Sequence, residues 1–146
     1  MHNQRRSDLP GAVLDTSVIV AAYKSRRGAS AEIFRLWREE GRFQLILSDP
    51  ILVEVTRVLL EHEVPESAVR ELVRVFHLQA ILTDNTYIVH GILADPSDNL
   101  LLAASMEGQA DYVVSLDRHV LAQKYYRGVQ IVWPRDFLKY LRSLAT

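Results

Sequence analysis

Short apolar runs alternate with longer amphipathic segments along this chain. The runs expected to form strands are residues 12–14, 43–47, 112–117 and 130–133. Helical spacing of apolar residues is seen in residues 29–40 and in segments that begin at Pro50, Pro65, Pro96 and Pro134. Strands that alternate with helices predict a parallel sheet covered by helices on both faces, which is an α/β fold.

Three segments are harder to assign from the pattern. Residues 17–23 fit a buried helix better than a second strand, although periodicity alone does not settle the choice. Residues 78–94 are ambiguous, with a strand near 79–82, a polar break and an apolar stretch at 87–93. Residues 1–10 are polar and end at Pro10, which predicts a flexible N-terminal arm before a single domain over residues 11–146.

Composition narrows the class of protein. The chain has 146 residues, enough for one domain with its own core, and a formal net charge of -1, so any basic surface for nucleic acid must be local. It has no cysteine, which excludes disulfides and zinc–thiolate sites. No apolar run approaches the roughly 20 residues of a membrane span, and the N-terminus lacks the apolar stretch of a signal peptide. We expect a cytoplasmic protein with no membrane partner.

Two of the predicted strands run into an aspartate, Asp15 and Asp117. In open α/β sheets, ligands bind just beyond the carboxyl ends of the strands, so both carboxylates are candidates for a functional site. The alternative is structural, because an Asp in this position can also cap the helix that follows. Both interpretations remain open from the sequence.

Two further acidic residues fall near helix starts. Asp49-Pro50 predicts a helix with Asp49 as N-cap, and Glu54 then lies on the flank of its apolar face, where it could lean over the sheet edge or reach solvent. Asp98 belongs to an almost wholly apolar helix, where a carboxylate is costly unless it is paired or bound to a cation. Asp95 is explained as the N-cap of that helix and is kept outside the core site.

Four carboxylates at one sheet edge would repel one another unless a cation neutralised them. The five histidines show no H-x-x-x-H or similar ligand spacing, so an all-oxygen site would select Mg²⁺ or Mn²⁺. Such a site suits phosphodiester hydrolysis, in which one metal lowers the pKa of the attacking water and a second stabilises the leaving oxygen.

Four segments resemble the successive motifs of PIN-domain proteins, in order, over about residues 11–137. They are LDTSVIV (14–20), SDPILVEV (48–55), DPSDN (95–99) and ADYVVSLD (110–117). The nearest branch resembles the toxin components of prokaryotic toxin–antitoxin pairs. The chain departs from many relatives at Ser17, where they carry Asn, and after Asp117, where they carry another acidic residue.

The resemblance implies a three-layer α/β/α fold with a central parallel sheet and a ribonuclease dependent on Mg²⁺ or Mn²⁺. By position, the metal-binding and catalytic carboxylates would be Asp15, Glu54, Asp98 and Asp117. Ser115 would contact phosphate or support the metal site, with a tie to a neighbouring loop as the alternative, and Thr16 or Ser17 would support Asp15. The resemblance also implies an RNA substrate, a cognate antitoxin protein and a homodimer.

Two basic clusters could hold phosphates, although each could equally be a solvated surface. They are Lys24, Arg26 and Arg27, and Arg118, Lys124 and Arg127.

Two other functions are alternatives to the nuclease. A non-catalytic PIN-like module that binds RNA or protein is opposed by the intact acidic set, and an aspartate phosphatase or phosphoryl receiver lacks its expected acidic pair at the first strand.

Overall fold

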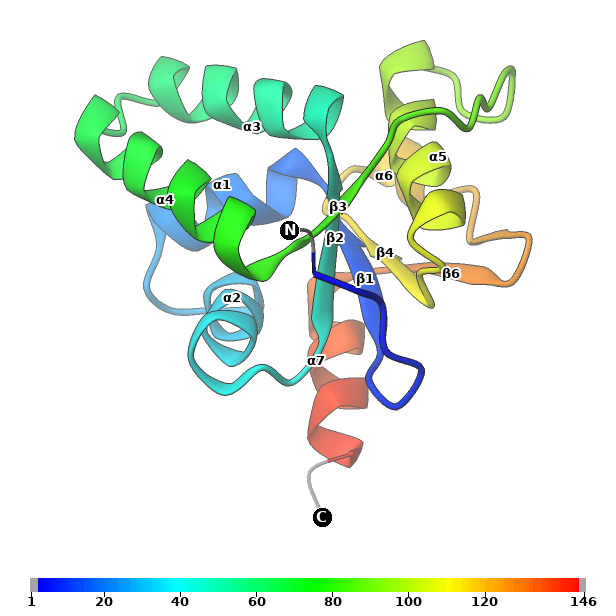
Figure 1. Cartoon of the computed structure of the whole chain (residues 1–146), viewed down its shortest axis with the longest axis horizontal. Helices are drawn as coiled ribbons and strands as arrows, with labels where there is room; N and C mark the ends of the chain where they lie inside the picture. The colour runs from blue at the N-terminus through cyan, green and yellow to red at the C-terminus, as the bar shows by residue number, and fades with distance from the viewer. Residues whose placement is uncertain (1–2, 145–146) are drawn as a thin grey trace.

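The computed structural model describes residues 3–144 and shows a six-stranded sheet with the order β3-β2-β1-β4-β6-β5 (Figure 1). All neighbouring strands are parallel except β5, which pairs antiparallel with β6 at one edge. The strands are β1 (Gly11–Leu14), β2 (Gln44–Ser48), β3 (Ile81–Thr83), β4 (Tyr112–Val114), β5 (Tyr125–Tyr126) and β6 (Val129–Val132). The predicted α/β fold with a mostly parallel sheet is therefore confirmed.

Helices flank this sheet on both sides. Figure 1 shows α1, α2, α3 and α4 on one side and α5 on the other, while α7 packs against α2. The helices are α1 (Thr16–Lys24), α2 (Ala29–Glu40), α3 (Asp49–Glu61), α4 (Glu66–Gln79), the 3₁₀ turn η1 (Pro96–Asp98), α5 (Asn99–Glu107), α6 (Arg118–Leu121) and α7 (Pro134–Ser143). Among residues 3–144, no helix is long and apolar enough to cross a membrane.

The core lies on both faces of the two central strands. All four residues of β1 are buried, as expected for a strand covered from both sides. Phe34 and Trp37 of α2 point inward and meet Phe76 of α4, so these rings belong to the core. This packing holds α2 and α4 together on one face of the sheet.

Several boundaries differ from the sequence-based expectations. The helix α4 continues to Gln79, so the third strand begins at Ile81 rather than near residue 79. Residues 84–95 form neither helix nor strand. Ser48 rather than Asp49 is the N-cap residue of α3. Residues 17–23 are helical, which settles the ambiguity in favour of the helix.

The hairpin of β5 and β6 was not predicted. Its two-residue turn, Arg127 and Gly128, has positive φ angles of 47° and 90°, the region that two-residue hairpin turns require. Arginine is an unusual residue for such a turn, so the sequence lacks the Asn-Gly or Asp-Gly signal. Tyr125 and Tyr126 consequently lie on β5, an edge strand of the sheet.

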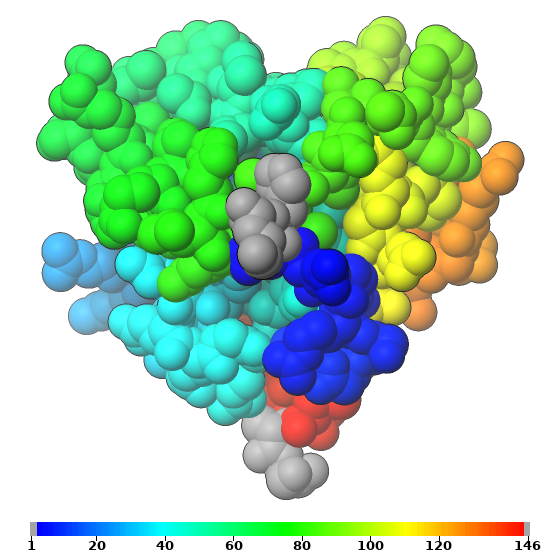
Figure 2. All heavy atoms as spheres, in the orientation of Figure 1, coloured from blue at the N-terminus to red at the C-terminus, as the bar shows by residue number. Residues whose placement is uncertain are grey.

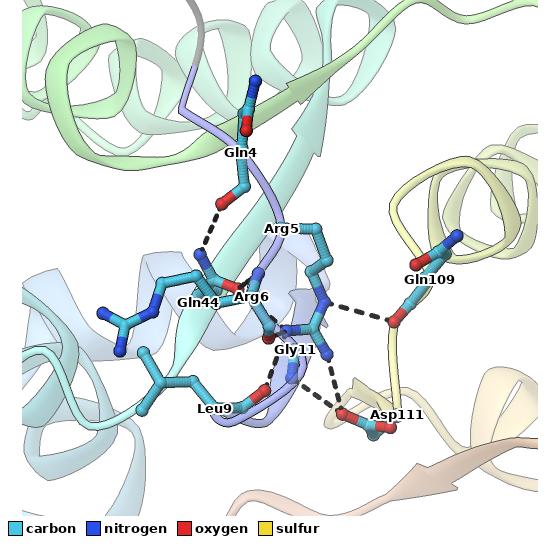
Figure 3. Close-up of polar contacts among 8 residues, drawn as sticks. All are labelled: Gln4, Arg5, Arg6, Leu9, Gly11, Gln44, Gln109 and Asp111. Carbon is cyan, nitrogen blue, oxygen red and sulfur yellow. Dashed lines mark hydrogen bonds and ion pairs between the residues drawn. The ribbon is translucent and has the colours of Figure 1, made fainter.

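The N-terminal segment expected to be a flexible arm lies against the domain (Figures 2 and 3). Arg5 donates hydrogen bonds to the side chain of Gln44 at 2.8 Å, to Asp111 at 3.0 Å and to the carbonyl of Gln109 at 3.3 Å. The side-chain amide of Asn3 donates to two carbonyls near the end of α4. Part of the expected arm, residues 1–2, lies outside the described residues, as do residues 145–146 of the expected domain.

Candidate active site

Asp15 is the most buried carboxylate at the carboxyl edge of the sheet, with 8% of its surface exposed. It occupies the N-cap position of α1, yet its side chain makes no capping hydrogen bond. Instead, one carboxylate oxygen accepts a 2.6 Å hydrogen bond from Ser115 and a 3.1 Å hydrogen bond from Ser17. The capping alternative raised from the sequence is therefore not how this side chain is used.

The pKa of Asp15 lies above its ordinary value. Burial is the largest cause, because removal from water disfavours the charged form, and the negative charge of Asp117 adds to it. The hydrogen bonds from Ser115 and Ser17 act in the opposite direction and favour the carboxylate. A buried acid held by hydroxyl donors close to other acids is the kind of group that a bound cation would stabilise.

Asp117 lies in the loop after β4. Its side chain caps the following helix and also stands among the acidic residues of the candidate site. Its Oδ1 accepts a 2.8 Å hydrogen bond from the backbone N–H of His119, which caps the short helix α6. Its own backbone N–H donates to the hydroxyl of Ser115 at 2.9 Å. The capping bond fixes the orientation of the Asp117 carboxylate and uses only one of its two oxygens.

Ser115 links the two aspartates that follow neighbouring strands. It is fully buried, and its hydroxyl donates to Asp15 while it accepts from the N–H of Asp117. Ser17 makes a parallel link, because it donates to Asp15 and accepts a 3.1 Å hydrogen bond from the backbone N–H of Leu116. The segments after β1 and β4 are therefore joined by two hydroxyl bridges.

Glu54 lies on the second turn of α3 and is partly buried. Its pKa is raised, first by burial and then by the negative charge of Asp15, while Arg57 lowers it. The hydroxyl of Thr16 also lowers the pKa of Glu54. The two side chains approach each other without forming a hydrogen bond of ordinary geometry. Glu54 therefore leans toward the sheet edge rather than away from it.

Asp98 is the residue on which all the other charges act. It ends the turn η1 and is partly buried, and its pKa is raised to about 6, with burial as the largest cause. The next causes are the negative charges of Asp15, Asp95, Asp117 and Glu54. Asp15, Glu54 and Asp117 come from three separate segments of the chain, so all three of the other predicted site residues lie within electrostatic reach of Asp98.

Asp95 behaves as a cap but is not remote from this cluster. Its Oδ1 accepts a 2.9 Å hydrogen bond from the backbone N–H of Ser97, which lowers its pKa and agrees with the N-cap interpretation. Its charge nevertheless raises the pKa values of both Glu54 and Asp98. Asp95 therefore lies at the rim of the acidic cluster.

Buried hydroxyls at this edge were missed by sequence reasoning. Ser48 and Thr83 are register partners at the ends of β2 and β3, and both have a buried hydroxyl with no hydrogen-bond partner among the described residues. The hydroxyl of Thr16, which the sequence offered as a support for Asp15, likewise has no hydrogen-bond partner among the described residues, whereas Ser17 does bond to Asp15. A Ser or Thr that directly follows an apolar strand run was the signal available in the sequence. Such unsatisfied oxygens are costly when dry, so they favour polar or hydrated surroundings at this edge.

The donor set at this edge suits a hard divalent cation. All the ligand candidates are oxygens, and three of the carboxyl groups have pKa values raised first by burial and then by the negative charge of their neighbours, an effect that a doubly charged ion would oppose. In the arrangement described for residues 3–144, however, no three His, Asp or Glu side chains stand close enough to share one ion. The oxygen ligands suit a divalent metal, but in this arrangement the carboxylates are too far apart to coordinate one ion together.

The two basic clusters are exposed at the surface. Lys24 ends α1, and Arg26 and Arg27 lie in the loop that leads into α2. In the second cluster, the Arg127 guanidinium lies 5.7 Å from the ring centroid of Tyr126, within cation–π range. His119 is also exposed, and only its backbone N–H is used in the site.

Comparison with protein-family models identifies a match to the PIN domain over residues 11–119, while no curated protein matches the chain. The match spans most of the chain and includes β1, β2, β4 and the four carboxylates described above. PIN domains are typically metal-dependent nucleases and generally use divalent metals. This chain belongs to the PIN-domain family.

Proposed function

We propose that this protein is an endoribonuclease that uses Mg²⁺ or Mn²⁺ to hydrolyse RNA phosphodiester bonds. The observation that supports this most strongly is the electrostatic coupling of Asp98 to Asp15, Glu54 and Asp117. A folded protein tolerates such a concentration of negative charge best when a cation is its normal partner.

In this proposal, Asp15, Glu54, Asp98 and Asp117 hold the metal. The bound ion supplies an activated water and neutralises charge on the phosphate. Ser115 and Ser17 orient the Asp15 carboxylate through the hydrogen bonds described above. Asp117 is held by its capping bond to α6 and keeps its second oxygen free for the metal. Gathering the carboxylates onto an ion requires rotation of their side chains from the arrangement described.

The test is cleavage of mixed RNA oligomers by the full chain with Mn²⁺, with EDTA as the metal-free control. Asp15→Asn should lower the cleavage rate about 10- to 100-fold or more, because removal of a group that only supports a metal ligand already costs about that much. Asp136→Asn is the matched control, because Asp136 is exposed on α7 and does not act on Asp98. Metal-dependent cleavage that survives Asp15→Asn would exclude this site, and RNA binding without cleavage would favour the non-catalytic module.

We further propose that the chain is the toxin of a toxin–antitoxin pair, blocked by a cognate antitoxin protein, and that it forms a homodimer. The support is the resemblance of its four motifs to that branch of the family. Induced expression in a bacterial host should arrest growth, and Asp15→Asn should relieve the arrest. Growth that is equally slow with both chains would contradict the toxin assignment, and sedimentation of the purified chain measures its oligomeric state.

A further inference from the structure

A small cavity lies beside the acidic cluster, outside the carboxylates themselves. Its volume is about 240 Å³, below the roughly 300–1,000 Å³ of pockets for drug-sized ligands, so its occupant is about the size of one ring system. It is lined by Ala29, Ser30, Leu116, Trp133, Pro134 and Arg135. Three segments form it: the first turn of α2, the loop after β4 and the first turn of α7.

The position of Leu116 places this cavity next to the candidate catalytic residues. Leu116 stands between Ser115 and Asp117 in the chain, and its backbone N–H donates to Ser17, which in turn donates to Asp15. Its side chain is 38% exposed, unusual for a leucine beside a buried strand. A group bound in the cavity would therefore contact Leu116, the residue immediately before Asp117.

The polar groups of the cavity are free to bind a ligand. Ser30 lines it with only 8% of its surface exposed, and among residues 3–144 its hydroxyl takes part in no side-chain hydrogen bond. The helices α2 and α7 both begin at this cavity without a side-chain cap. A serine hydroxyl that lines a cavity and is not engaged by another side chain can donate to or accept from a ligand.

The remaining walls suit a flat ring. Trp133 is partly buried, and the Arg135 guanidinium lies 5.9 Å from its ring centroid. Indole and guanidinium planes are the surfaces on which unstacked RNA bases stack. The exposed Arg26 and Arg27 lie in the loop that leads into α2, whose first residues line the cavity, and this loop carries positive charge that could contact the RNA backbone.

From this geometry we propose that the cavity binds one nucleobase of a single-stranded RNA next to the scissile phosphate. This rests on the proposed ribonuclease function and adds a base-selective subsite to it. Trp133 and Arg135 form the stacking surface, and Ser30 hydrogen-bonds the edge of the base. The subsite gives the enzyme a preference for the base next to the cleaved bond.

The test measures binding apart from cleavage. The full chain with Asp98→Asn is titrated in EDTA with tetraribonucleotides of A, C, G or U and with an abasic tetramer of equal charge. Tryptophan fluorescence reports the cavity, because Trp37 is buried and Trp133 lines the cavity, and Trp133→Phe should abolish the change. At least one base should bind about 5- to 150-fold more tightly than the abasic tetramer.

Two substitutions then locate the binding. Ala29→Leu fills the cavity and should reduce the affinity for RNA to that of the abasic tetramer, whereas Ala31→Leu, two residues along the same helix and outside the cavity, should leave it unchanged. Ser30→Ala should weaken binding of the preferred base about 2- to 12-fold. Thermal melting of each variant identifies any loss of folding, and Ser30→Ala keeps the test valid if Ala29→Leu unfolds.

The outcomes separate the two proposals. Equal binding of RNA and the abasic tetramer, or unchanged binding by Ala29→Leu, overturns the base subsite. No binding of any oligonucleotide also overturns it and leaves the cavity for a protein side chain. If base-selective binding is found but the metal-loaded wild-type chain cuts no RNA, the subsite stands and the proposed nuclease fails. If cleavage occurs at the same bonds with Ala29→Leu, the nuclease stands and the subsite fails.

Discussion

The Ser115 hydroxyl donates a 2.6 Å hydrogen bond to the carboxylate of Asp15, one hundred residues earlier in the chain. The two residues follow neighbouring parallel strands, and Val114 is the register partner of Leu14. Because Ser115 also accepts from the backbone N–H of Asp117, one buried hydroxyl holds both aspartates in relation to each other. This link leads to the first prediction.

Ser115→Ala should destabilise the protein and reduce the proposed nuclease activity. The substitution leaves the Asp117 N–H without a partner and removes the shorter of the two hydrogen bonds to one Asp15 oxygen, which costs about 1–3 kcal/mol of unfolding free energy. Urea denaturation measures this change. Ser105→Ala is the matched control, because Ser105 is equally buried but donates only to the carbonyl of Leu102 in its own helix. A larger loss of activity in the control would contradict the role of Ser115.

The stability of the metal-free protein should fall as the pH rises through the titration range of Asp98. The pKa of Asp98 is about 6 in the folded state and 3.8 in its unperturbed state, so the native protein binds more protons between these values. The unfolding free energy therefore declines from about pH 4 to pH 6 and levels off above. Because Asp98 is partly exposed, we expect a contribution on the order of 1 kcal/mol after allowing for solvent screening.

Asp98→Asn isolates this effect. The variant lacks the titrating group, so its unfolding free energy should decline less than that of the wild type between pH 4 and pH 6 in EDTA. Chemical denaturation at several pH values gives the difference between the two curves. Parallel curves for the two proteins would show that the crowding of Asp98 by its acidic neighbours has no energetic consequence.

Divalent metal should stabilise the folded protein at pH 7.5 and do so much less at pH 5. Protons compete with the metal for Asp98 below about pH 6, so the affinity for metal increases as the pH rises. At a metal concentration 100 times the dissociation constant, the gain is about 2.7 kcal/mol. Differential scanning calorimetry with Mn²⁺ measures it. The same gain at both pH values, or an unchanged gain in Asp98→Asn, would count against a metal bound at this cluster.

The contacts of Arg5 should make the N-terminal segment a stabilising part of the domain. The Arg5 side chain is 15% exposed and bonds to Asp111, Gln44 and the Gln109 carbonyl, so Arg5→Ala should cost about 1–3 kcal/mol. Arg6→Ala is the control, because Arg6 is 62% exposed and pairs with the exposed Asp8, and such surface pairs contribute little to stability. Equal unfolding free energies of the two variants would show that the segment is not held by Arg5.

Much of this arrangement could be predicted because it depends on local patterns. Apolar strands that end in Asp15 and Asp117, and the N-cap at Asp95, are signals within a few residues of sequence. The placement of Asp98 near the other acids followed from the cost of a carboxylate on an apolar helix, although Asp98 ends a 3₁₀ turn before α5 rather than lying within the helix.

The remaining features depend on contacts between residues distant in the chain. Nothing near Arg5 in sequence predicts that Asp111 and Gln44 will meet it, so a polar segment was expected to be free. The turn at Arg127 has the conformation usually adopted by Asn or Gly, so the final hairpin carried no recognisable signal. The cavity of Ser30 and Trp133 is formed by segments about a hundred residues apart and could not be seen from either one alone.

The pairing of β1 with β4 determines when during synthesis the acidic cluster can be completed. A nascent chain that has emerged only as far as α5 already holds Asp15, Glu54 and Asp98, but the strand that would sit beside β1 has not yet been made. Incomplete chains released by a stalled ribosome therefore lack both Ser115 and Asp117. The complete acidic cluster is confined to translation products that extend beyond β4, and prematurely terminated fragments hold only part of it.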